Sequence, residues 1–267
     1  MIARLRDKVV QAASFIRKTR TPLPLILDSF RLMRYPFTAT DHEGISLQLN
    51  PSQGDSFTFY EMLLRRDYLC HGIVINAGDT VVDIGANIGG FSVLAARLVG
   101  PSGRVISFEP NPATFQRLLQ NIALNRLENV TAYPDGVGGE AGTLDLYMHT
   151  KSALASLYDS VDGRSSDPNQ AVRVQVRILA EIFRSNHLEQ IDMLKVDCEG
   201  AEYGIFDVME PGFARRIKQV AMEVHAIPGR TYQGLVDRMA ALGFDVRATY
   251  PLVAFQRDFD PATRSAN

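Results

Sequence analysis

Cysteine is scarce in this 267-residue chain, which has only Cys70 and Cys198, far apart in the sequence. This scarcity excludes a disulfide framework and a structural zinc site, and it fits a reducing compartment. Long apolar runs are also missing, because the most apolar stretch, residues 81–100, contains the charged residues Asp83 and Arg97. The N-terminus has no apolar segment with a cleavage site of the signal-peptide type. We therefore expect a cytoplasmic protein without a membrane span.

A strong excess of charge of either sign is missing as well. The chain has 28 Lys and Arg residues against 30 Asp and Glu residues, which gives a net charge of −2. Because there is no long basic run, general binding of nucleic acid is not expected. Hydrophobic residues make up 46% of the chain, enough for a full core, and this excludes a disordered or collagen-like protein.

The first 34 residues depart from this balance, with eight basic residues against two acidic ones. Apolar residues at spacings of three and four, among them Val9 and Ile16, predict an amphipathic helix over residues 2–18. A second apolar stretch covers residues 25–34. We favour a packing or oligomerising helix with a solvated basic face. Weak association with an anionic membrane surface is the alternative.

From about residue 80, short β-rich runs alternate with runs of helical period. This alternation predicts an α/β fold, in which helices cover both faces of a mainly parallel sheet. We expect a main domain over residues 45–257, after an N-terminal helical extension (1–44) and before a C-terminal tail (258–267). The expected strands are Thr80–Ile84, Arg104–Phe108, Val130–Tyr133, Ile191–Val196, Gln219–Val224, Asp245–Thr249 and Leu252–Phe255.

Two further expected strands, Leu144–Met148 and Val172–Val176, break the alternation. The segment between them, residues 151–171, is rich in Ser, Asp, Gly and Asn and predicts a loop. It is either a lid over the acceptor or an ordinary surface insertion. Three of its side chains are candidates for hydrogen bonds to a polyhydroxylated acceptor: Ser152, Ser156 and Tyr158.

A glycine-rich turn, DIGANIGGFS (residues 83–92), follows the first strand of the alternating region and opens a helix. In open α/β sheets, ligands bind beyond the carboxyl ends of the strands, where helix N-termini offer N–H groups to anions. The spacing is not that of a dinucleotide fingerprint, because Asn87 replaces the second glycine of G-x-G-x-x-G. This replacement counts against NAD, NADP and FAD.

The next strand ends at Glu109, twenty-four residues beyond Gly85. A carboxylate at this place can accept hydrogen bonds from both hydroxyls of a ribose. S-adenosylmethionine is a ligand with a ribose but no pyrophosphate, and its methionine carboxylate would face the helix N-terminus. The sequence therefore predicts S-adenosylmethionine as the cofactor.

Polar side chains follow the fourth and fifth strands, in the segments LKVDCEGAE and MEVH. In the strand order 3-2-1-4-5 these strands are neighbours, so we expect Asp197, Glu199 and His225 to converge. A histidine beside acids at such an edge is a candidate general base. Glu202, at the start of the following helix, is either a capping acid or a member of the same group.

Together these segments resemble the FkbM family of S-adenosylmethionine-dependent methyltransferases over about residues 58–245. The matching segments are FYE (59–61), VVDIGANIGGFS (81–92), SFEPNP (107–112), LKVDCEGAE (194–202) and MEVH (222–225). The resemblance implies a class I methyltransferase-like Rossmann sheet of seven strands, the last one antiparallel. It also implies methyl transfer to a hydroxyl of a small molecule, a sugar or another secondary metabolite.

By position, the resemblance also implies a set of cofactor-binding residues. Asp197 would meet the methionine end of the cofactor and Asp135 the adenine amino group. Gly136 stands where the family more often has alanine. The expected set is Tyr60, Glu61, Asp83, Gly85, Ala86, Asn87, Gly89, Glu109, Pro110, Asn111, Asp135, Gly136 and Asp197.

For catalysis we expect His225 to act as general base, oriented by Glu199 or Glu223. Lys195 either stabilises developing negative charge or anchors the turn after the fourth strand. A divalent metal is the alternative, because Asp197, Glu199, Glu223 and His225 offer the ligands that hold Mg²⁺ or Mn²⁺. Nothing in their spacing requires a metal.

Three other functions fit these segments less well. Nucleic-acid N-methylation usually carries an Asn/Asp-Pro-Pro-aromatic turn after the fourth strand, and VDCEGAE does not resemble it. A nicotinamide oxidoreductase is disfavoured by Asn87. A non-catalytic module that binds S-adenosylmethionine or a partner is the main alternative, and retention of the acids and His225 argues against it. The sequence identifies neither the methyl acceptor nor the oligomeric state.

Overall fold

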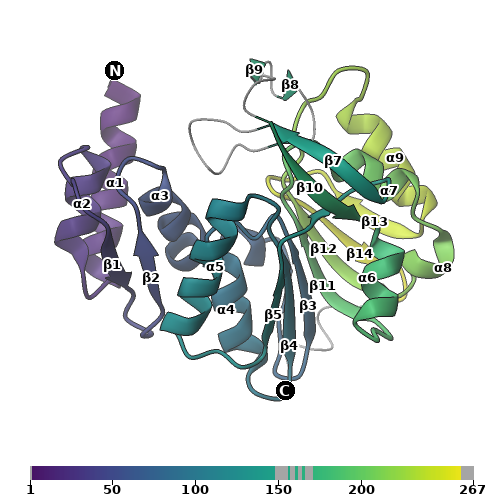
Figure 1. Cartoon of the computed structure of the whole chain (residues 1–267), viewed down its shortest axis with the longest axis horizontal. Coiled ribbons are helices and arrows are strands. Elements are labelled where there is room, and N and C mark those ends of the chain that lie inside the picture. The colour runs from purple at the N-terminus through teal and green to yellow at the C-terminus, as the bar shows by residue number, and fades with distance from the viewer. Residues whose placement is uncertain (1, 148–155, 157–159, 162–163, 166–170, 260–267) are drawn as a thin grey trace.

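The centre of the molecule is a seven-stranded sheet in the order β13-β14-β12-β11-β3-β4-β5 (Figure 1). The computed structural model describes residues 2–147, 156, 160–161, 164–165 and 171–259. β14 runs antiparallel to both of its neighbours, whereas the other pairs are parallel. The predicted sheet of seven strands with an antiparallel last strand is therefore confirmed. The strands are β3 (Thr80–Ile84), β4 (Arg104–Phe108), β5 (Val130–Tyr133), β11 (Ile191–Val196), β12 (Ile217–Met222), β13 (Phe244–Arg247) and β14 (Leu252–Gln256).

The observed boundaries of these strands differ from the predicted ones by at most two residues. β12 begins and ends two residues earlier than expected, so Glu223 is the first residue beyond the strand. All six residues of β11 are buried, as expected for a central parallel strand with helices on both faces. The carboxyl ends of β3, β4, β11 and β12 therefore meet at one edge, as the sequence pattern predicted.

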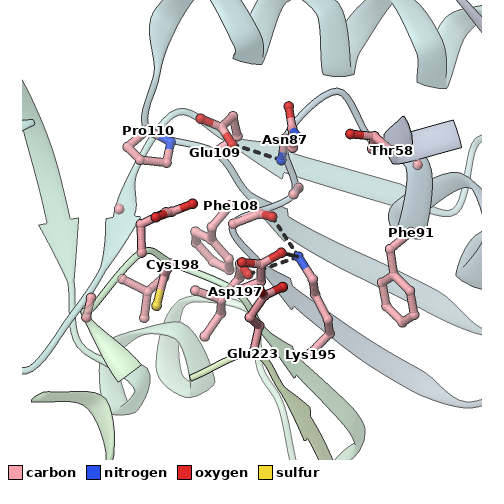
Figure 2. Close-up of a pocket in the computed structure, with 18 of the residues that line it drawn as sticks. Thr58, Asn87, Phe91, Phe108, Glu109, Pro110, Lys195, Asp197, Cys198 and Glu223 are labelled. Atoms are coloured by element: carbon pink, nitrogen blue, oxygen red, sulfur yellow. Dashed lines mark hydrogen bonds and ion pairs between the residues drawn. The ribbon is translucent and has the colours of Figure 1, made fainter. Parts of the chain in front are cut away.

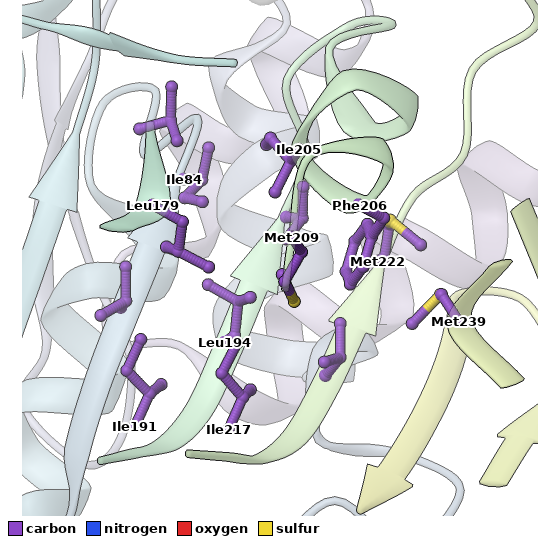
Figure 3. Close-up of a cluster of buried hydrophobic side chains, with 14 of the residues drawn as sticks. Ile84, Leu179, Ile191, Leu194, Ile205, Phe206, Met209, Ile217, Met222 and Met239 are labelled. Atoms are coloured by element: carbon purple, nitrogen blue, oxygen red, sulfur yellow. The ribbon is translucent and has the colours of Figure 1, made fainter. Parts of the chain in front are cut away.

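Helices cover both faces of the sheet, and successive strand residues point to opposite faces. On one face, Leu194 packs in a cluster with Phe206 of α7, which Figure 3 shows. On the other face, Met193 packs in a separate cluster with Phe91 of α4. The helices are α4 (Gly90–Val99), α5 (Pro112–Leu124), α6 (Leu179–Ser185), α7 (Glu202–Asp207), α8 (Pro211–Ala214) and α9 (Tyr232–Ala241).

The N-terminal region forms two helices and a β-hairpin that lie beside α4 and α5 (Figure 1). The predicted helix over residues 2–18 is confirmed as α1, whereas α2 and the hairpin of β1 and β2 were not predicted. The expected division between residues 44 and 45 lies within the turn of this hairpin, and a separate extension stays a prediction. The elements are α1 (Ile2–Lys18), α2 (Pro22–Ser29), β1 (Phe37–Thr40), β2 (Ser46–Leu49), α3 (Asp55–Phe59), the π-helical η1 (Tyr60–Arg65) and the 3-10 helix η2 (Asp67–Leu69).

The basic helix α1 packs on the rest of the chain. Lys8 Nζ donates a hydrogen bond to the Ser29 carbonyl and Lys18 Nζ donates one to the Leu64 carbonyl, each at 2.7 Å. Phe15 is fully buried. Packing by this helix is therefore confirmed, whereas oligomerisation and membrane association stay predictions. Within the described part of the chain, no helix is long and apolar enough to cross a bilayer.

A small second sheet, in the order β6-β10-β7, lies beside the main one. Its strands are β6 (Gly136–Val137), β7 (Gly142–Tyr147) and β10 (Ala171–Arg177). Within the predicted loop, β8 (Ser160–Val161) pairs with β9 (Arg164–Ser165). Ser156 Oγ donates to the carbonyl of Glu199, whereas Ser152 and Tyr158 lie outside the described residues. A lid function for this segment stays a prediction.

Candidate functional site

A cavity of about 330 Å³ lies at the carboxyl ends of β3, β4, β11 and β12 (Figure 2). Residues of α3 and η1 close its other side. Its size is typical of a small-molecule site. Most of the residues predicted from the sequence line it: Glu61, Gly85, Ala86, Asn87, Glu109, Pro110, Asp135, Gly136, Lys195, Asp197, Glu199 and His225.

Four predicted residues do not line this cavity. Tyr60 points elsewhere, with its ring edge-on to Phe15 at 5.9 Å between centroids. Asp83 is fully buried below the cavity. Gly89 is the N-cap of α4, and the side chain of Asn111 caps α5. Asp83, Gly89 and Asn111 therefore support the structure around the cavity without lining it.

In the turn after β3, Gly85 and Asn87 both have a left-handed backbone conformation. Gly85 has a φ of +74°, and a Cβ on it would lie 1.7 Å from the carbonyl oxygen of Asp197. Only glycine therefore lets the turns after β3 and β11 approach each other this closely. Asn87 also has a positive φ, +50°, which asparagine tolerates better than most residues.

Glu109 presents a fixed carboxylate to the cavity. Its Oε2 accepts a hydrogen bond from the Asn87 N–H at 2.8 Å (Figure 2), and its Oε1 accepts one from the Asn111 N–H at 2.9 Å. Burial raises the pKa of Glu109 to about 7, although both N–H groups work to lower it. Each oxygen keeps a second lone pair, so the carboxylate can also accept hydroxyls of a ligand.

The wall beside Glu109 is apolar and narrow, which suits an aromatic base. A Cβ on Gly136 would lie 3.3 Å from Val176 Cγ2, so alanine would be tight at this position. The predicted adenine partner, Asp135, already accepts a 2.6 Å hydrogen bond from Arg177 Nε through its Oδ2. The apolar lining residues are Phe108, Pro110, Val137 and Leu146.

Lys195 joins three neighbouring elements below the cavity. Its Nζ lies 3.1 Å from Asp83 Oδ1 and 3.6 Å from Asp197 Oδ2, and it donates to the Gly85 carbonyl at 2.7 Å. Burial works to lower the pKa of this ammonium, but the two carboxylates outweigh burial and raise it. Lys195 is therefore a cation at neutral pH, and its contacts favour the anchoring role.

His225 is oriented by a carboxylate other than the two expected. Its Nδ1 lies 2.9 Å from Oε1 of Glu202, a fully buried residue. Glu199 and Glu223 lie near Nε2 instead, at 3.8 and 3.9 Å, too far for hydrogen bonds. The expected orienting residue was therefore wrong, because α7 directs Glu202 back toward the end of β12.

A group of carboxylates surrounds the outer nitrogen of His225. The oxygens nearest to Nε2 belong to Glu199 (3.8 Å), Glu223 (3.9 Å) and Asp197 (4.0 Å). Burial works to lower the pKa of His225, but Glu202, Asp197 and Glu199 together raise it to about 10. The ring of His225 is therefore a cation at neutral pH, with a proton on both nitrogens. The predicted convergence of Asp197, Glu199 and His225 is confirmed.

Several residues of the site were not predicted. Tyr68 donates a 3.0 Å hydrogen bond to Asp197 Oδ2, and Tyr250 donates one of 2.8 Å to Glu223 Oε1. The first pair is 129 residues apart, so no local pattern indicates it. Further unpredicted lining residues come from α3, η1 and the residues just before α3: Gln53, Phe57, Thr58 and Met62.

The fixed carboxylate, the apolar slot and the glycine turn fit S-adenosylmethionine. Glu109 lies where it can accept the ribose hydroxyls, and the slot around Gly136 suits the adenine. Gly90, at the start of α4, also lines the cavity, and a Cβ there would lie 3.1 Å from Met62. The turn after β3 thus borders the cavity through glycines at two positions, Gly85 and Gly90.

Comparison with known proteins agrees with this geometry. The sequence profile of the methyltransferase FkbM domain matches residues 83–246, more than half of the chain. The 31-O-demethyl-FK506 methyltransferase FkbM of Streptomyces tacrolimicus is 29% identical over 216 residues, which are 72% of this chain and 82% of that protein. Methyltransferase sdnD of Sordaria araneosa is 32% identical over 169 residues, covering 54% of this chain and 65% of that protein.

A crystal structure of a methyltransferase FkbM from Methylobacillus flagellatus superposes with a TM-score of 0.47 and 14% identity. The alignment covers 88% of this chain and 59% of that one. From the extent of the profile match, the chain belongs to the FkbM family of S-adenosylmethionine-dependent methyltransferases.

Proposed function

We propose that this methyltransferase transfers the methyl group of S-adenosylmethionine to a hydroxyl oxygen of a small molecule, a sugar or another secondary metabolite. The observation that carries the proposal is the group of Glu199, Glu223, Asp197 and His225 at one end of the cavity. A hydroxyl needs such a group, because its pKa is close to that of water, about 15.7, and its proton must leave during attack. The name of the Streptomyces relative, a 31-O-demethyl-FK506 methyltransferase, describes an O-methylation by that protein.

The cavity arranges the reactants in a line. When bound, the cofactor supplies an electrophilic methyl group on its sulfonium sulfur. Glu109 would hold the ribose, and the turn at Gly85 and Asn87 would hold the methionine end. Asp197 and His225 would then border the space for the acceptor oxygen. Holding two reactants in such a near-attack geometry supplies a large part of the acceleration.

Glu199 takes the proton of the acceptor hydroxyl in this proposal. His225 was the base expected from the sequence, but its imidazole already holds a proton at neutral pH. Glu199 lies 3.8 Å from His225 Nε2 and lines the cavity, so its carboxylate is within reach of the acceptor oxygen. The positive charge at Nε2 stabilises the negative charge that develops on that oxygen.

Lys195 acts as a positioning residue. Its ammonium holds the Gly85 carbonyl and the carboxylates of Asp83 and Asp197 together. This fixes the turn that receives the cofactor relative to the end of β11. Its side chain is only 3% exposed, so it contributes mainly by anchoring.

Calorimetric titration with S-adenosylmethionine and S-adenosylhomocysteine tests the cofactor site. The wild type is expected to bind both ligands, and Glu109→Ala is expected to lose most of this affinity. Glu128→Gln serves as the matched control. Glu128 is an exposed residue just before β5, at the amino end of that strand and so away from the carboxyl ends that line the cavity. A folded wild type that binds neither ligand would contradict the proposal at its first step.

Transfer of a labelled methyl group to a panel of sugars and hydroxylated metabolites tests the reaction. Glu199→Gln and His225→Ala are each expected to lower turnover by two orders of magnitude or more, with much smaller effects on cofactor affinity. Unchanged turnover in both variants would remove this end of the cavity from the mechanism. Labelling of amines or nucleic acid, with no labelling of hydroxyls, would refute the proposed acceptor class.

A further inference from the structure

We propose that Asp197, Glu223 and His225 bind a divalent cation of the Mg²⁺/Mn²⁺ class at the acceptor end of the cavity. The three residues come from the turns after β11 and β12 and all line the cavity. The catalytic role of the ion rests on the proposed function, whereas its binding does not. The two are therefore tested separately.

The three side chains present their ligand atoms to a common point. One atom from each, the His225 nitrogen and a carboxylate oxygen of Asp197 and of Glu223, all lie within 4.8 Å of one another. His225 Nε2 is 4.0 Å from Asp197 Oδ1 and 3.9 Å from Glu223 Oε1. Adjacent ligands of an octahedral ion at ~2.1 Å lie roughly 3.0 Å apart, so the ligands need to close by about 1 Å. Small rotations of the two carboxylate side chains provide this movement.

The burial of His225 and the contact of its inner nitrogen are those typical of a metal-binding histidine. The residue is 5% exposed, and Nδ1 contacts Glu202 at 2.9 Å. Ligating histidines almost always donate their other ring N–H to a carboxylate, which fixes the tautomer and aims the free nitrogen. Here that nitrogen is Nε2, which has no hydrogen-bond partner among the described residues. In the metal-free protein Nε2 carries a proton, and binding of the ion displaces it, because a ligating histidine must be neutral. The ion then supplies the positive charge that the protonated imidazole supplies without it. This buried nitrogen, which lies among the carboxylates without a hydrogen bond to any of them, distinguishes the site from a simple group of acids.

The two carboxylate ligands are supported in the same way. Tyr68 donates to Asp197 Oδ2, which leaves Oδ1 as the oxygen nearest to His225. Tyr250 donates to Glu223 Oε1, which keeps a further lone pair. Every ligand thus has an outer partner that orients it, and such partners are typical of metal sites.

The local charge also favours a divalent cation. Lys195 lies closer to Asp83 than to Asp197, at 3.1 against 3.6 Å, so the carboxylates of Asp197 and Glu223 bring net negative charge to the side of His225 Nε2. Oxygen ligands with a single imidazole suit Mn²⁺ and Mg²⁺ better than thiolate-seeking metals. A divalent ion lowers the pKa of a hydroxyl bound to it, which would ease loss of the acceptor proton to Glu199.

Binding of Mn²⁺ to the full-length protein, first freed of metal with EDTA, tests the site. The EPR signal of free Mn²⁺ decreases as the ion binds, and this decrease is the readout. We expect one Mn²⁺ per chain, with Mg²⁺ competing. Asp197→Asn, Glu223→Gln and His225→Ala should each weaken binding at least tenfold, and Glu202→Gln should weaken it by roughly 10 to 100-fold. Glu128→Gln should bind Mn²⁺ as the wild type does. Thermal unfolding of each variant verifies that it is folded.

Absence of Mn²⁺ binding by the wild type at millimolar concentration would overturn the proposal, as would binding that the three ligand variants leave unchanged. Calorimetry with S-adenosylhomocysteine on the same samples separates this result from failure of the cofactor site. Methyl transfer that survives exhaustive EDTA treatment would overturn the catalytic role of the ion.

Discussion

Cofactor affinity is expected to fall as the pH is lowered through about 7, because Glu109 then gains a proton. Burial raises the pKa of Glu109 to about 7 in the ligand-free protein. Ribose hydroxyls donate to the carboxylate, so ligand binding favours the charged form and lowers the pKa of Glu109 from this raised value. If only the charged form binds, affinity at pH 6 should be about tenfold below affinity at pH 8.

Glu109→Gln gives the same perturbation without a change of pH. Both oxygens of Glu109 accept backbone N–H groups, at 2.8 and 2.9 Å, so the amide nitrogen of glutamine would face one of these donors. Hydrogen bonds to a charged group contribute about 1 kcal/mol more than neutral ones. For two ribose hydroxyls the loss is about 2 kcal/mol, roughly a 30-fold increase in Kd.

Calorimetry between pH 6 and 8 measures both effects. The amino group of S-adenosylhomocysteine can titrate near this range, so 5′-methylthioadenosine, which has the ribose but no amino acid, is the matched ligand. Wild type should show the pH dependence with both ligands, and Glu109→Gln should show weak, nearly flat binding of 5′-methylthioadenosine. Wild-type affinity for that ligand that is independent of pH, or a Glu109→Gln variant with unchanged Kd, would refute the role given to this carboxylate.

Three substitutions test the framework around the site, each by urea unfolding. Gly85→Ala should destabilise the fold by more than about 3 kcal/mol and abolish cofactor binding, because its Cβ would overlap the Asp197 carbonyl at a positive φ. A stable variant that binds the cofactor would show that the two turns separate freely. Phe206→Ala, at a fully buried position, should cost about 3–5 kcal/mol, and a cost under 1 kcal/mol would argue against the packing of α7. Lys195→Met should lower the free energy of unfolding by about 3–5 kcal/mol, because it leaves the buried Asp83 without its ion-pair partner. Part of this stability should return in the double variant with Asp83→Asn. Equal losses in the single and double variants would count against the ion pair.

The sheet and most of the cavity were predictable from local patterns. Strands and helices alternate from residue 80 onward, and parallel strands bring the residues that follow them to one edge. Glu109, Asp197 and His225 were therefore assigned to one site although they are far apart in the chain. Their position depends on strand order, and the order assumed for such a sheet, 3-2-1-4-5, is the one observed.

The failures concern side chains whose direction depends on packing. Tyr60 was expected at the cofactor, but the π-helical geometry of η1 turns it toward Phe15 while Glu61 lines the cavity. For Glu202 the sequence left two roles open, a capping acid or a member of the acid group, because the rotation of α7 decides where its carboxylate points. Tyr68 reaches Asp197 only through tertiary structure. The hairpin of β1 and β2, with four residues in each strand, was also not predicted, because it lies outside the alternating region.

We expect the cavity beyond β3 and β4 to hold S-adenosylmethionine with its methyl group directed at the acids around His225. A crystal structure with S-adenosylhomocysteine would test this arrangement. We expect both ribose hydroxyls at hydrogen-bond distance from Glu109, the adenine beside Gly136, and the sulfur facing Asp197. A ligand bound outside this cavity, or one with its ribose away from Glu109, would refute this arrangement.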